Sequence, residues 1–193
     1  MRPTRVTVSL PVVALGAVLL LAVAGCEGSD RGRASGQFAW LRPATPPTGW
    51  NVARTRGGAM LPYPPGWTPI KTDPGTASVA LLGGGKRIDG YLNATPRQGN
   101  ETLADWSRFR PQHNRSEGDR DVGVVAATST ARFRSGRGAC VIDAYTTSEA
   151  SYREIACLVS GPGSSAVVVA AAPTVLWDRQ AATLQRAVSS FVA

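Results

Sequence analysis

Two adjacent segments, 139–147 and 152–160, constrain the fold of this chain more than any other feature. Both are rich in Val, Ile, Thr and Tyr, which predicts antiparallel strands joined by the four-residue turn 147–150. Counting outward from that turn places Cys140 directly opposite Cys157. Facing residues of antiparallel strands have Cα atoms roughly 4.5–5.5 Å apart, a separation that a disulfide accepts. The segments therefore predict a disulfide-linked β-hairpin.

The same register sorts the other hairpin residues onto two faces. Ile142 faces Ile155 on one face, and Tyr145 faces Tyr152 on the other. This pairing of like with like supports the register, because cross-strand pairs are the unit that stabilises a sheet.

Two carboxylates also face each other, Asp143 and Glu154. They repel unless an arginine, a bound cation or a shared proton with a raised pKa compensates. Arg132, Arg134 and Arg153 are the expected neighbours, so we favour a structural ion cluster. A cation site, or a catalytic acid–base pair in a pocket beside the two tyrosines, is the alternative.

The amino-terminal segment indicates where the chain resides. Arg2 and Arg5 precede an apolar run from 6 to 24, which is typical of a signal sequence. Its end, Leu21-Ala22-Val23-Ala24-Gly25-Cys26, resembles a bacterial lipobox, in which Cys26 receives a diacylglyceryl group. The resemblance implies a signal peptide over 1–25 and a protein anchored to the cell membrane on its extracytoplasmic face, since two acyl chains suffice for lasting attachment. An uncleaved anchor or an ordinary secretory signal are the other readings.

The cysteine count and the charge fit this interpretation. Acylation of Cys26 leaves Cys140 and Cys157 to each other in an oxidising compartment. Removal of 25 of the 193 residues leaves 168, enough for one domain, and the loss of Arg2 and Arg5 lowers the net charge from +8 to +6. A basic surface outside the membrane attracts anionic headgroups or envelope polymers, and we expect no nucleic-acid partner.

The remaining composition divides the chain in two. Residues 26–50 are rich in Gly, Pro and Arg, which predicts a flexible tether. Its one apolar stretch, 38–41, is either a short docking segment or an unstructured bump. Residues 51–193 are expected to form a single globular domain with strands near 50–61, 76–82, 89–95, 122–134, 139–147, 152–160 and 165–172. One helix is expected to begin at Asn100 and end at Pro111, and another to follow Pro173.

The sequence contains no recognisable catalytic or cofactor-binding motif. There is no Gly-x-Ser-x-Gly elbow and no cluster at metal-ligand spacing. The single histidine, His113, falls in a charged segment where it is expected to be solvated. We therefore predict a protein that is not an enzyme, with no catalytic residue, metal or cofactor.

The order of these elements resembles a known family. A Pro65-Gly66-Trp67 turn, a strand pair, the short helix Leu103-Ala104-Asp105-Trp106, a strand meander and a last helix ending Ser189-Ser190-Phe191 are similar to the PsbP-like domain, including lipoproteins of the LpqN type. The resemblance covers about 59–193. It implies an α+β fold, an antiparallel sheet of six to seven strands with packed helices in an α/β/α sandwich, and a role in partner binding.

Two functions follow from the sequence. The first is an anchored binding or scaffolding module for an envelope protein, lipid or glycan. The sequence does not distinguish this function from that of a purely structural surface protein. The second is an envelope hydrolase that uses the Asp143/Glu154 pair. The binding surface is expected to include Trp67, Tyr91, Trp106, Asp143, Tyr145, Tyr152 and Glu154.

Overall fold

A seven-stranded antiparallel sheet organises the domain. The computed structural model describes residues 36–193, so the expected signal peptide, Cys26 and the first part of the tether lie outside the described residues. The sheet runs β3-β4-β5-β9-β8-β7-β6, and a separate hairpin pairs β1 with β2. The strands are β1 (Asn51–Arg54), β2 (Met60–Tyr63), β3 (Thr68–Ile70), β4 (Ala77–Leu82), β5 (Ile88–Pro96), β6 (Arg120–Phe133), β7 (Gly136–Thr146), β8 (Ser151–Ser160) and β9 (Ser165–Pro173).

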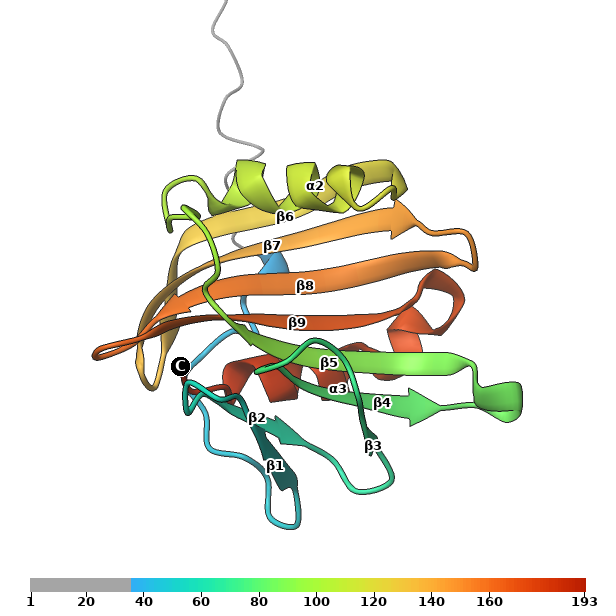
Figure 1. The fold of residues 1–193 in the computed structure, drawn as a ribbon, viewed down its shortest axis with the longest axis horizontal. Coiled ribbons are helices and arrows are strands. Elements are labelled where there is room, and N and C mark those ends of the chain that lie inside the picture. The colour runs from blue at the N-terminus through green and yellow to red at the C-terminus, as the bar shows by residue number, and fades with distance from the viewer. Residues whose placement is uncertain (1–35) are drawn as a thin grey trace, which may run out of the picture.

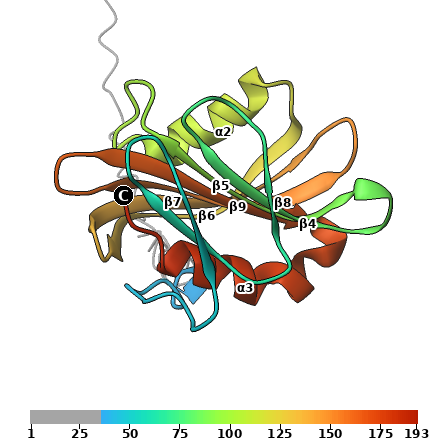
Figure 2. The same ribbon diagram turned by 60° about the horizontal axis from the view of Figure 1, so that its bottom comes forward.

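Two α-helices lie on opposite faces of this sheet (Figures 1 and 2). Helix α2 (Trp106–Ser116) packs over β6, β7 and β8, and α3 (Trp177–Ser189) packs mainly on β9. Short 3₁₀ turns, η1 (Gly84–Lys86) and η2 (Thr174–Leu176), join β4 to β5 and β9 to α3. The result is the expected α+β fold, a helix-sheet-helix sandwich with a seven-stranded antiparallel sheet.

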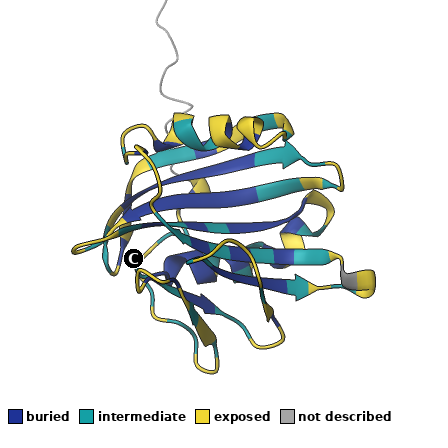
Figure 3. Cartoon of the chain, viewed as in Figure 1, coloured by how far each residue is buried: buried dark blue, intermediate teal, exposed yellow. Residues whose placement is uncertain are grey.

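The main core lies between the sheet and α3. Alternate residues of the long strands face it, as the period of a strand requires, and they contact Leu184, Val188 and Phe191 at the end of the chain. A smaller core lies under α2, around Trp106, Val141, Ala156 and Leu158. Figure 3 shows the buried centre of β7 and β8, where both cores meet the sheet.

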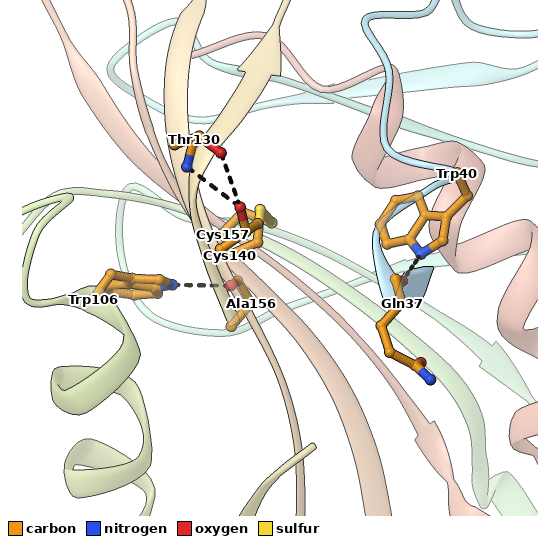
Figure 4. Close-up of a disulfide and its surroundings, with 8 residues drawn as sticks. Gln37, Trp40, Trp106, Thr130, Cys140, Ala156 and Cys157 are labelled. Atoms are coloured by element: carbon orange, nitrogen blue, oxygen red, sulfur yellow. Dashed lines mark hydrogen bonds between the residues drawn. A yellow bond between two sulfur atoms is a disulfide. The ribbon is translucent and has the colours of Figure 1, made fainter. Parts of the chain in front are cut away.

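The β7–β8 hairpin has the expected register. Cys140 pairs with Cys157, Ile142 with Ile155, Asp143 with Glu154 and Tyr145 with Tyr152. The two cysteines form a disulfide across Cα atoms 4.1 Å apart, buried on the α3 side (Figure 4). The disulfide prediction is confirmed. The same register places the cysteines and isoleucines on one face of the hairpin and the carboxylates and tyrosines on the other.

The domain begins earlier in the chain than expected. Phe38 is buried in the main core, Trp40 and Leu41 pack against it, and the amide of Ala44 donates to the carbonyl of Ser189 at 3.0 Å. Residues 36–50 are thus part of the domain, and not of a flexible tether. The apolar stretch 38–41 is a docking segment because these side chains cover the edge of the core beside α3.

The first long helix also differs from expectation. It begins at Trp106, after a turn in which the amide of Asp105 donates to Thr102, so Asn100 does not cap it. It continues through Pro111 to Ser116. Pro111 cannot donate to the carbonyl of Ser107, but Ser107 is exposed, so water can satisfy that carbonyl. His113 therefore lies on a helix, and not in a loop.

Within residues 36–193 no helix is both long enough and apolar enough to span a bilayer.

Candidate functional site

Helix α2 is held on the sheet by three polar side chains spaced four residues apart. The indole Nε1–H of Trp106 donates to the carbonyl of Ala156 at 2.9 Å. The amide of Asn114 donates to Asp143 Oδ2 at 3.3 Å. Arg110, between them, binds Glu154. Residues at this spacing share one helix face, so the three form a stripe against β7 and β8.

The Arg110–Glu154 pair compensates one of the two facing carboxylates. Arg110 Nε and Nη2 donate to the two carboxylate oxygens of Glu154 at 2.6 and 2.8 Å, and Glu154 is 1% exposed. Burial opposes the positive charge, but the Glu154 carboxylate outweighs it and raises the pKa of Arg110 above its ordinary value. The arrangement is a bidentate ion pair, the strongest geometry available to a guanidinium.

An arginine therefore compensates the pair, but it is not one of the three that we expected. Arg153 is the neighbour of Glu154 on β8 and therefore faces the opposite side of the sheet. There its guanidinium lies over the ring of Trp177, 5.0 Å from the ring centroid. Arg132 and Arg134 are exposed where β6 ends. Arg110 lies within the helix that the sequence predicted, but no local pattern specifies that this helix packs over the β7–β8 hairpin, so its pairing with Glu154 was missed.

Asp143 is the uncompensated member of the pair. It is fully buried, and within the described chain its Oδ1 has no hydrogen-bond partner. Burial, reinforced by the nearby Glu154 charge, raises the pKa of Asp143 from 3.8 to about 8. Burial and the Glu154 charge also raise the pKa of Asp119. The raised pKa favours the protonated form of Asp143, so the cluster combines an arginine ion pair with a buried carboxyl group that resists ionisation.

The two tyrosines extend the cluster toward solvent. Tyr145 and Tyr152 stack with ring centroids 5.8 Å apart, and the Tyr145 hydroxyl donates to Glu154 at 3.3 Å. Burial raises the pKa of Tyr152, with Glu149 adding to the effect. Both rings line a hollow of about 350 Å³ whose floor includes Tyr91 of β5.

A larger groove of about 550 Å³ adjoins that hollow along α2. Helix α2 covers only the β6–β8 half of its sheet face, so the groove lies between the helix and the strands β5 and β9. Tyr91 and Tyr145 line both spaces. The walls and floor of the groove are formed by side chains from seven segments, mainly Asp73, Tyr91, Asn93, Thr95, Glu101, Trp106, Phe109, Arg110, His113, Glu117, Tyr145, Glu154, Val167 and Val169.

The sheet thus brings together six of the seven residues that the sequence proposed for a binding surface. Tyr91, Trp106, Asp143, Tyr145, Tyr152 and Glu154 all lie on the α2 side. Only the tyrosines are appreciably exposed there, because Trp106, Asp143 and Glu154 are buried.

Trp67 does not belong to this surface. It is 7% exposed and lies in the main core, beside Gly90 of β5. A Cβ at Gly90 would come within 2.7 Å of the Trp67 ring, so the glycine makes room for the indole. The Pro-Gly-Trp turn therefore serves packing, and the prediction of a binding role for Trp67 is wrong.

The sequence missed the residues that complete the groove. The expected end of the helix at Pro111 left His113 and Glu117 outside it, and no local pattern indicated that Phe109 or Glu101 faces this groove. Val167 and Val169 lie in a strand that the sequence predicted, but its continuous apolar pattern did not indicate that one face is only partly buried.

Metal-ligating side chains do not converge in the groove. Over residues 36–193, no three His, Cys, Asp or Glu side chains are placed to hold one metal ion.

Comparisons with known proteins define the fold. No protein-family model and no curated protein sequence matches the chain. Among solved structures, cyanobacterial PsbP (CyanoP) from Synechocystis sp. PCC 6803 is similar with a TM-score of 0.54 and 19% identity, over 74% of this chain and 91% of that one. A Pseudomonas aeruginosa protein of unknown function, PA94, described as a putative regulator, gives 0.50 and 10%, over 75% and 96%.

LpqN of Mycobacterium tuberculosis, involved in cell envelope biogenesis, is more distant, with a TM-score of 0.39 and 11% identity over 78% of this chain and 88% of that one. This chain has the PsbP-like fold, as the resemblance in its sequence predicted. At these identities the likeness extends to the fold alone.

Proposed function

We propose that this protein is a membrane-anchored binding module of the bacterial cell envelope, held by a diacylglyceryl group on Cys26, and that the groove beside α2 is its ligand site. The observation that carries the proposal is the groove itself. On the opposite face α3 and the segment 36–50 cover the core, whereas the α2 face leaves aromatic and polar side chains around an open space. A concave, partly apolar site with a few convergent polar groups is the usual form of a ligand pocket.

The hydrolase alternative finds no support in this geometry. A general acid or base must reach the substrate within hydrogen-bond distance. Both oxygens of Glu154 are bound by Arg110, and Asp143 is fully buried and does not line the groove. The pair is better explained as the anchor of α2, which positions one wall of the groove.

The anchor is tested by the intact mass of membrane-extracted protein, before and after reduction and alkylation. We expect the loss of residues 1–25, a diacylglyceryl-sized addition on Cys26, and two alkylation sites that appear only after reduction. Cys26→Ser should abolish the addition and release the protein from the membrane. An unmodified full-length mass with three free thiols would refute the anchor and the compartment together.

The groove is tested by amide chemical shifts of the folded domain, titrated separately with an N-acetylglucosamine oligomer, a short-chain phosphatidylglycerol and a tetralysine peptide. We expect at least one probe to shift groove amides in β5 and β9 while α3 amides stay unchanged. Val169→Trp should fill the groove and abolish that response, whereas Val175→Trp, at a 91% exposed position on η2, should not. Thr95→Tyr is the second blocking variant if the tryptophan disturbs folding. Responses that survive both blocking variants would overturn the assignment.

A further inference from the structure

The groove is acidic although the chain is strongly basic. Four carboxylates line it, from Asp73, Glu101, Glu117 and Glu154, against the single guanidinium of Arg110. With His113 neutral, the formal charge of the lining is −3, in a protein of net charge +8. The adjoining hollow adds Glu149 and no basic side chain. A cleft lined by one sign of charge concentrates counter-ions, so this surface selects for cations.

Glu101 provides a second and independent observation. It is 5% exposed and lines the groove, and its Oε1 accepts the backbone N–H of Gln98 at 3.1 Å. Its Oε2 has no partner among residues 36–193. That oxygen lies over Gly99, where a Cβ would approach it to 2.7 Å. Buried carboxylate oxygens are normally bonded, so a half-satisfied carboxylate in the wall of the groove marks a place for a donor, which a small rotation of the Glu101 side chain would admit.

The remaining walls suit an organic cation rather than a metal ion. No three of the acidic side chains within the described residues converge on one point, as a metal would require. Instead, partly exposed rings of Tyr91 and Phe109 stand among them. Aromatic faces attract ammonium and guanidinium groups, and do so more strongly when the cation is partly desolvated.

From these observations we infer that the groove binds a ligand carrying an alkylammonium group, with Glu101 as the carboxylate that receives it. The inference rests on the proposed function and names its ligand class. A free polyamine and a lysine side chain of a peptide share this chemistry.

The experiment compares 1,5-diaminopentane with the neutral 1,5-pentanediol at low ionic strength, following amide shifts in β5, β9 and α2. We expect the diamine to shift them saturably and the diol to leave them unchanged. Glu101→Gln keeps the shape and removes the charge, and should weaken diamine binding about tenfold, the effect of losing one charge-assisted hydrogen bond. Asp178→Asn, an exposed carboxylate on α3, is the matched control and should leave affinity unchanged.

Equal responses to diamine and diol, or wild-type affinity in Glu101→Gln, would overturn the inference. If that variant does not fold, Glu117→Gln on the exposed rim replaces it, with an expected loss of about threefold. A parallel titration with tetralysine shows whether the ligand is a lysine side chain of a peptide or a free polyamine. Binding of either amine supports the shared chemistry. Binding of only the sugar or the phospholipid would refute the ammonium ligand and leave the binding module intact.

Discussion

Replacing Asp143 with asparagine should stabilise the protein at neutral pH, although the residue is buried and hydrogen-bonded. Its folded-state pKa is about 8 against 3.8 for an unperturbed carboxyl. The native state therefore holds a proton that the unfolded state has lost. The stability contributed by Asp143 is fully present below about pH 4 and is lost as the pH rises through about 8.

The magnitude follows from the same two values. Each unit of pKa difference is worth about 1.4 kcal/mol, so at pH 7 keeping Asp143 protonated costs up to about 4 kcal/mol. Asparagine has no such cost and keeps an oxygen that can accept the bond from Asn114. We expect Asp143→Asn to raise the free energy of unfolding by about 2–4 kcal/mol at pH 7.5 and by little at pH 4.5.

Glu154→Gln is the matched comparison, because it changes the facing carboxylate by the same chemistry. It leaves Arg110 buried with an unpaired charge, and should cost about 3–5 kcal/mol. The two variants are measured by urea unfolding between pH 4.5 and 8.5, with the disulfide intact. Each variant's free energy of unfolding is compared with that of the wild type at the same pH, so the titration of the other carboxylates, which all three proteins share, cancels. If Asp143→Asn destabilises at pH 7.5 as Glu154→Gln does, Asp143 is ionised in the folded protein and the reasoning is refuted.

Three further changes probe the attachment of α2, the disulfide and the main core. Trp106→Phe removes the buried bond to the Ala156 carbonyl and should cost about 1 kcal/mol in urea unfolding, where an unchanged stability would mean that this bond does not hold α2. Joint replacement of Cys140 and Cys157 by alanine opens a link across 17 residues and should cost about 3 kcal/mol, whereas reduction of the double variant should change nothing more. Gly90→Ala brings a Cβ within 2.7 Å of the Trp67 ring and should lower stability by about 1–3 kcal/mol, and Trp67→Leu should relieve part of that loss.

The parts of the fold that the sequence predicted are those encoded locally. The β7–β8 hairpin follows from alternation around a short turn, and a register fixed at the turn determines every facing pair as far as the cysteines. The strands β4, β5 and β9 and the final helix were recognised in the same way. In each case the pattern of one continuous segment suffices.

The groove could not be predicted because it is assembled from distant segments. Its floor exists only because β5 pairs with β9, which brings Tyr91 beside Ala171, and no local pattern specifies that partner. Its wall depends on α2 continuing through Pro111, whereas a proline usually ends or kinks a helix. The core position of Trp67 likewise depends on a glycine in another strand.

The attachment of α2 explains why a buried carboxylic acid is retained beside the groove. The helix presents few large apolar side chains to the sheet, and an indole, a guanidinium and an amide bind it there. Arg110 and Asn114 each require an acceptor on β7 or β8, and the register places those acceptors opposite each other. Two ionised carboxylates at this distance would repel, and burial together with the Glu154 charge raises the pKa of Asp143, which favours its neutral form and reduces the repulsion. A protonated Asp143 accepts the bond from Asn114 without opposing the Arg110–Glu154 pair, and the two bonds together hold the polar helix as the wall of the site.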